Sequence, residues 1–78
     1  MDIETKIMNI IAEHLVVPKD KCNRDARFVE DLEADSVEII ELAMKFEQEY
    51  GVTIEDQELY KIRTIQDAVN LVQKKLNG

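Results

Sequence analysis

The chain has 78 residues, enough for one small domain with a modest core, which argues against a large catalytic cleft. Hydrophobic residues make up 45% of it and charged residues 35%, a balance typical of a folded protein rather than a disordered one. The net charge of −7 repels the phosphates of nucleic acids and anionic lipids. We therefore expect a single domain over residues 1–78, with basic protein partners, no nucleic acid and no membrane insertion.

The single cysteine, Cys22, excludes an internal disulfide and a four-cysteine zinc site, which fits a reducing compartment. The acidic start, Met-Asp-Ile-Glu, lacks the basic and apolar regions of a signal peptide. No apolar run approaches the roughly 20 residues of a membrane span. These features predict a cytoplasmic protein.

Apolar residues at helical spacing predict a first helix from Ile3 to Leu15, with Asp2 as its cap. The stretch from Val16 to Asp35 keeps neither a helical nor a strand period, so we expect a long loop held by scattered apolar residues. A loop of roughly 20 residues is unusual in a small domain unless it is functional or partly helical.

The pattern Asp35-Ser-Val-Glu predicts a capping box at the start of a second helix, which runs to Tyr50 and ends at Gly51. A further cap within Thr-Ile-Glu-Asp, residues 53–56, predicts a short helix towards Tyr60.

The last helix is predicted to start at the segment Thr-Ile-Gln-Asp, residues 64–67. Its expected buried stripe is Ile65, Ala68, Val69, Val72 and Leu76. Since no stretch alternates with period two, the fold class is all-α. We predict a small four-helix bundle, with three longer helices, one short helix and a long first loop.

The acidic residues are concentrated in the middle of the chain, where residues 28–60 hold eleven of them and a single basic residue. On the predicted second helix, Glu38 and Glu41 share one side, and Val37 and Met44 lie at its border with the apolar side. Two interpretations stay open. The stripe either docks on a basic, partly apolar partner or is a solvated face over an ordinary core.

Ser36 lies where the second helix begins, and the unpaired N–H groups there favour an anion such as a phosphate. A plain first-turn role is the simpler interpretation. Catalysis has no support, because the only histidine, His14, lies within the first helix, and Cys22 lacks a second cysteine or an evident base. No EF-hand, P-loop or dinucleotide motif is present.

The run Phe-Val-Glu-Asp-Leu-Glu-Ala-Asp-Ser-Val, residues 28–37, followed by Glu-Ile-Ile-Glu-Leu, resembles the signature of the acyl carrier protein family. The resemblance extends to the Ile-rich first helix, to Gly-Val-Thr-Ile at residues 51–54 and to the segment at residues 64–67. A long first loop and a short third helix are features of that family. The lack of a catalytic base also fits, since the resemblance implies a non-catalytic carrier.

The resemblance implies that Ser36 is the attachment point of 4′-phosphopantetheine, donated by coenzyme A and transferred by a holo-carrier synthase that recognises Asp35. Its thiol would carry growing fatty acyl chains as thioesters among separate synthesis enzymes and acyltransferases with basic docking patches. We expect the carrier to be a monomer. The implied docking residues are Val37, Glu38, Glu41, Met44, Glu47 and Asp56. The residues implied to line an acyl pocket are Leu42, Phe46, Ile54 and Ile62.

Two residues depart from the family pattern: Glu33 stands where many relatives have Gly, and Val37 where Leu is usual. Gly51 and Thr53 replace acids that are thought to bind divalent cations in some relatives. No specific metal is expected, although Glu30, Asp35 and Glu38 are left as a candidate weak divalent site.

Fatty-acid synthesis is the function that the resemblance favours. A carrier of the same fold could instead serve polyketide, lipid A or D-alanine transfer. An unmodified acidic helical adaptor would keep the acidic stripe and have no use for Ser36.

Overall fold

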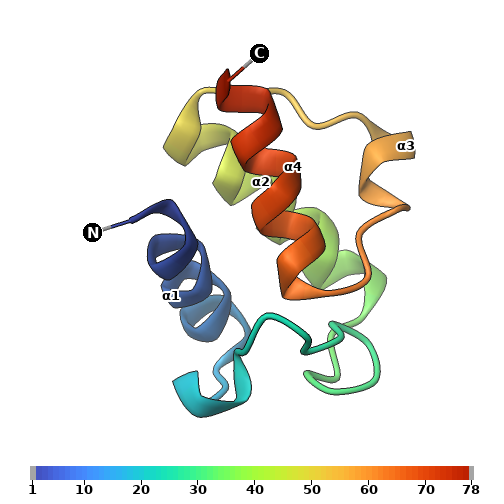
Figure 1. Cartoon of the computed structure of the whole chain (residues 1–78). Helices are drawn as coiled ribbons and strands as arrows, with labels where there is room; N and C mark the ends of the chain where they lie inside the picture. Colours follow the sequence, from blue (N-terminus) through green and yellow to red (C-terminus); the bar gives the residue numbers. More distant parts are fainter. Residues whose placement is uncertain (1, 78) are drawn as a thin grey trace.

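The computed structural model describes residues 2–77, which form helices joined by one long loop and shorter connections (Figure 1). Their helices are α1 (Ile3–Leu15), the 3-10 turn η1 (Lys19–Lys21), α2 (Ser36–Tyr50), α3 (Asp56–Leu59) and α4 (Ile65–Asn77). Within this part of the chain the one β-type pairing is an isolated antiparallel bridge between Arg27 and Thr64. The fold is therefore the predicted all-α bundle of three longer helices and one short helix.

The core lies where α1, α2 and α4 pack on one another, and the short α3 lies to the side of α4 (Figure 1). Each long helix presents an apolar stripe with helical spacing to this core. The largest side chains with almost no exposed surface are Ile7, Ile11, Ile65, Val69 and Val72. No helix of residues 2–77 is long and apolar enough to cross a membrane.

Local signals account for the ends of the helices. The carboxylate of Asp2 accepts a hydrogen bond from the N–H of Thr5 at 2.7 Å and so caps α1. After α2, Gly51 takes a left-handed conformation with φ +64°, which a residue without Cβ adopts at no steric cost. The end of α1 uses Val16 in the same region, at φ 55°.

The long first loop is ordered by contacts with the start of α4. The N–H of Phe28 donates to the carbonyl of Arg63, and the N–H of Ile65 donates to the carbonyl of Ala26, both at 3.0 Å. Buried apolar side chains anchor the same loop to the core: Cys22, Ala26, Phe28, Leu32 and Ala34. The loop is thus partly helical at η1 and is held both by hydrogen bonds to the segment before α4 and by apolar contacts with the core. These contacts explain how a compact domain accommodates it.

The short helix begins at Asp56 with Glu55 as its cap, within the segment in which a cap was predicted. One detail differs from the sequence-based expectation. Leu76 was predicted to belong to the buried stripe of α4, but it is 45% exposed. It lies in the last turn of α4, beyond the part of that helix that packs on the core.

Candidate functional site

Ser36 is the first residue of α2, and its position is set by a reciprocal capping box. Asp35 Oδ1 accepts a hydrogen bond from the N–H of Glu38 at 2.9 Å, and Glu38 Oε1 accepts one from the N–H of Asp35 at 3.1 Å. The carboxylates of Asp35 and Glu38 are therefore both engaged in hydrogen bonds with backbone N–H groups at the start of α2. Ser36 is exposed, and no hydrogen bond found within residues 2–77 uses its hydroxyl group.

Neither of the two other side chains considered for catalysis contacts Ser36. His14 Nε2 lies 3.2 Å from Glu41 Oε1, in the contact between α1 and α2. Cys22 is buried in the core, and burial raises the pKa of its thiol. Among the described residues 2–77, neither side chain is therefore placed to activate the Ser36 hydroxyl group.

A hollow beside Ser36, which we call the first hollow, has a volume of about 170 Å³. Apart from Ser36 its lining residues are Ile39, Ile40, Leu59, Tyr60 and Ile62. The residues three and four positions after a helix residue share its face, which explains why Ile39 and Ile40 border Ser36. The apolar lining fits a hydrocarbon or a slender linker attached at Ser36.

A second hollow of about 580 Å³ lies between the first loop and the segment that precedes α4. Its lining residues are Arg27, Phe28, Val29, Glu30, Ile39, Ile62, Arg63 and Thr64. Ile39 and Ile62 line both hollows, so this pair of side chains forms the boundary between them.

The predicted acyl-pocket residues lie at different depths. Ile62 lines the first hollow, whereas Leu42 and Phe46 are only 2% and 3% exposed in the core, and Ile54 is half-buried against it. Four of the hollow's lining residues were not among the predicted pocket residues: Ile39, Ile40, Leu59 and Tyr60. Ile39 and Ile40 could have been predicted from the sequence, because they follow Ser36 by three and four positions on the same helix.

The predicted docking residues are exposed to different degrees. Val37 and Met44 are 61% and 53% exposed, so their apolar surfaces are accessible to a partner. Glu41 is exposed as well, although it also contacts His14. The remaining three differ: Asp56 is exposed at the start of α3, Glu38 is half-buried in the capping box, and Glu47 is half-buried and accepts a hydrogen bond from the N–H of Ile54.

The three carboxylates proposed as a divalent site do not form one. Glu30 pairs with Arg27 at 3.5 Å, while Asp35 and Glu38 face each other in the capping box. Nowhere in residues 2–77 do three or more His, Cys, Asp or Glu residues come together in a group able to hold a metal ion.

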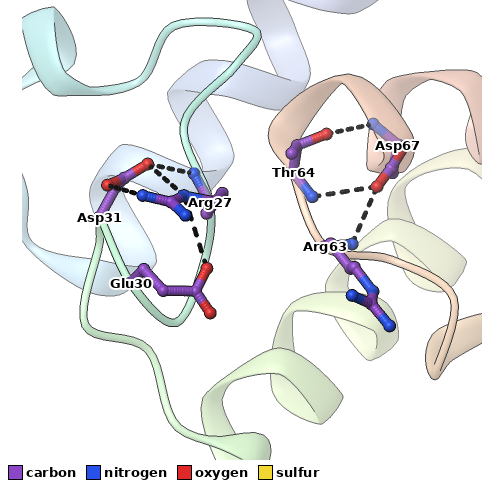
Figure 2. A network of polar contacts seen from close by, with 6 residues as sticks. All are labelled: Arg27, Glu30, Asp31, Arg63, Thr64 and Asp67. Carbon is purple, nitrogen blue, oxygen red and sulfur yellow. Dashed lines mark hydrogen bonds and ion pairs between the residues drawn. The ribbon is translucent and has the colours of Figure 1, made fainter.

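Two small polar networks fix the backbone around the second hollow (Figure 2). In the loop, Asp31 accepts hydrogen bonds from the backbone and side chain of Arg27, which lower the pKa of the Asp31 carboxyl. At the start of α4, Asp67 Oδ2 accepts from the N–H groups of Arg63 and Thr64 at 3.0 and 3.1 Å. The side chain of Arg63 points away from that network (Figure 2).

Within residues 2–77, Ser36 thus combines an exposed hydroxyl group at a helix start with an apolar hollow beside it and no contacting base. This arrangement suits the covalent attachment of a group rather than catalysis. The family described as "Phosphopantetheine attachment site" matches residues 5–72, and the chain belongs to that family. Within it, the similarity is to acyl carrier proteins. The acyl carrier protein of Petrotoga mobilis is 53% identical over 72 residues, which are 92% of this chain and 85% of that protein.

A solved structure agrees. The crystal structure of acyl carrier protein from Thermotoga maritima superposes with a TM-score of 0.80 at 36% identity, covering 94% of this chain and 85% of that one. The chain is therefore an acyl carrier protein: a non-catalytic carrier whose cofactor is 4′-phosphopantetheine and which interacts with synthesis enzymes.

Proposed function

We propose that Ser36 carries the 4′-phosphopantetheine arm and that the chain transports growing fatty acyl groups among the separate enzymes of a dissociated fatty-acid synthase. The observation that supports this most strongly is the exposed hydroxyl group of Ser36, which has no hydrogen-bond partner in residues 2–77 and lies at the edge of the first hollow. The residues present fit the cofactor for two reasons. The Ser36 hydroxyl group is exposed and can act as the nucleophile, and the surface beside it is apolar.

In the loading step, the Ser36 oxygen attacks the phosphorus of coenzyme A that bears the pantetheine. A new serine–oxygen–phosphorus bond forms, the phosphoanhydride bond breaks, and the adenosine bisphosphate leaves. The proton of the hydroxyl passes to a base of the holo-carrier synthase, because no base within residues 2–77 contacts Ser36. The arm's thiol then holds each acyl group as a thioester.

The exposed apolar and acidic side chains of α2 are the proposed contact surface for partner enzymes. Val37 and Met44 would bury their exposed apolar surface against the partner enzyme. Glu41 and the neighbouring carboxylates would attract a basic patch of that enzyme and orient it. Asp35 and Glu38 present the serine to the holo-carrier synthase through the capping box. Glu47 and Asp56 extend the same acidic surface towards α3.

The beginning of an acyl chain would rest against Ile39 and Ile62, which line both hollows. Leu42 and Phe46 are buried in the core and Ile54 is half-buried against it, so a longer chain would reach them only if the core opened. We place the carrier in a reducing compartment, the cytoplasm, because its single cysteine leaves it without an internal disulfide.

The test is to supply the loaded carrier to purified enzymes of each pathway. We expect malonyl transfer from malonyl coenzyme A by the acyltransferase of dissociated fatty-acid synthesis, followed by elongation, and much slower loading by a D-alanine ligase or a polyketide acyltransferase. Preferential loading by either of the latter enzymes would assign the chain to another pathway. Binding of basic proteins that is unchanged in Ser36→Ala, without any acyl transfer in the wild type, would favour the adaptor.

A further inference from the structure

A phosphate on Ser36 would enter an acidic environment. The flanking Asp35 and the nearby Glu38 are both carboxylates, and the phosphodiester adds a further negative charge that persists at every physiological pH. Because Asp35 and Glu38 are hydrogen-bonded to the backbone of the helix start, they cannot turn away without breaking the capping box. A cation close to this position would offset the repulsion.

Two arginines line the second hollow, and they differ in their partners. Arg27 is paired with Glu30 at 3.5 Å and with Asp31 at 3.3 Å. The guanidinium of Arg63 has no carboxylate partner within residues 2–77. Figure 2 shows it pointing away from the Asp67 network to which its own backbone N–H belongs. Arg63 is thus a cation that is available to an incoming anion.

The backbone of Arg63 is held firmly although its side chain is unpaired. Its N–H donates to Asp67 Oδ2 at 3.0 Å, and its carbonyl accepts from the N–H of Phe28 at 3.0 Å. The backbone that carries the guanidinium is therefore fixed at the rim of the second hollow. Binding of a ligand by Arg63 would cost little backbone entropy.

Arg63 lines the hollow next to the one that Ser36 lines. It directly follows Ile62, which lines the first hollow together with Ser36, and it lines the second hollow together with Ile62 and Ile39. A linker that leaves Ser36 and crosses the Ile39–Ile62 pair passes from one hollow to the other beside Arg63. A planar guanidinium fork is well suited to two oxygens of a phosphate.

We propose that Arg63 is a positioning residue that pairs with the phosphodiester of the 4′-phosphopantetheine arm and directs the arm over the Ile39–Ile62 pair into the second hollow. There the apolar part of the linker lies against Val29 and Phe28, on the loop side of α2 rather than along α3. This inference rests on the proposed attachment at Ser36.

Lys61 provides a matched control. It is an exposed cation on the other side of Ile62, and it lines a different hollow that faces Asp67 and Lys74. Replacement of either residue by Gln removes one positive charge from the same connection. Only the change at Arg63 removes a cation from the proposed path of the arm.

The experiment uses wild type, Arg63→Gln, Arg63→Lys and Lys61→Gln, each in the apo form and fully loaded on Ser36 as verified by intact mass and peptide fragmentation. The direct readout is the ³¹P resonance of the phosphodiester. We expect it to shift in Arg63→Gln, to stay at the wild-type position in Lys61→Gln and to lie between in Arg63→Lys. High salt should move the wild-type resonance towards that of Arg63→Gln.

Thermal melting gives a second readout. Loading should raise the melting temperature of the wild type by roughly 2 °C more than that of Arg63→Gln, as expected for one exposed charge pair in a domain of this size. Identical ³¹P resonances and identical gains on loading in wild type and Arg63→Gln would overturn the role of Arg63 while leaving attachment at Ser36 intact. An equal effect of Lys61→Gln would also overturn it. Absence of loading on Ser36 would overturn both proposals.

Discussion

Glu47, near the end of α2, accepts a hydrogen bond from the backbone N–H of Ile54 at 2.8 Å. This contact ties the segment that follows Gly51 back onto the helix and so sets where α3 begins. Family resemblance assigns Glu47 to partner docking, but its half-buried carboxylate also has this partner within the chain. The residue is therefore expected to affect stability as well as association.

Glu47→Ala should lower the free energy of unfolding by about 1 to 2 kcal/mol, because it removes a hydrogen bond to a charged acceptor and leaves a half-buried N–H group without a partner. Urea denaturation measures the change. The control is Gln48→Ala, which truncates the exposed neighbour and should cost less than about 0.5 kcal/mol. Equal losses in the two variants would show that the Glu47–Ile54 contact contributes nothing to stability.

Glu33→Gly should stabilise the fold by about 0.5 to 1 kcal/mol. Glu33 has φ 57°, in the left-handed region that disfavours a side chain with Cβ, and the gain is partly offset by the greater freedom of Gly in the unfolded chain. Glu33→Ala is the control, since it removes the same charge and keeps Cβ. If both variants were stabilised to the same extent, relief of charge repulsion rather than of backbone strain would be the cause.

Glu41→Lys should slow association with the holo-carrier synthase about tenfold at low salt and less than about twofold at high salt. The physical reason is the loss of steering by an exposed carboxylate on α2, and stopped-flow kinetics at two salt concentrations measure it. Glu13→Lys makes the same charge change on α1 and should have a smaller effect. Equal slowing in both salts would remove Glu41 from the docking surface.

Cys22 should react slowly with iodoacetamide in the folded protein and rapidly in urea. It is only 3% exposed, and burial raises the pKa of its thiol, so the reactive thiolate is scarce at neutral pH. The raised pKa means that the folded state keeps the proton, and stability should fall as the pH rises above the unfolded thiol's pKa. Rapid modification under native conditions, or a disulfide-linked dimer after mild oxidation, would contradict the buried position.

Local signals predicted most of the helical framework. The bounds of α1 follow from its apolar spacing, and the capping box that begins α2 is formed by the two residues that the sequence indicated. The backbone at Glu33 explains why Gly is usual at this position in the family. Glu33 has φ 57°, in the left-handed region that Gly adopts without steric cost.

Long-range contacts were not predictable in the same way. The pairing of Arg27 with Thr64 joins residues far apart in the chain, and neither residue belongs to a strand-like pattern. The three carboxylates named as a candidate divalent site are likewise engaged in other contacts within residues 2–77: Glu30 pairs with Arg27, and Asp35 and Glu38 form the capping box. Arg63 was missed because a single exposed arginine has no motif, and its significance comes from the hollow that it shares with Ile39 and Ile62.

The central claim is that Ser36 carries the cofactor, and intact mass spectrometry tests it most directly. Wild type and Ser36→Ala are incubated with coenzyme A, Mg²⁺ and a broad-specificity phosphopantetheinyl transferase, after circular dichroism has shown that both are folded. The account predicts a gain of one phosphopantetheinyl unit in the wild type, located on Ser36 by peptide fragmentation, and no gain in Ser36→Ala. An equal gain in both proteins, or none in a folded wild type with several transferases, would contradict it.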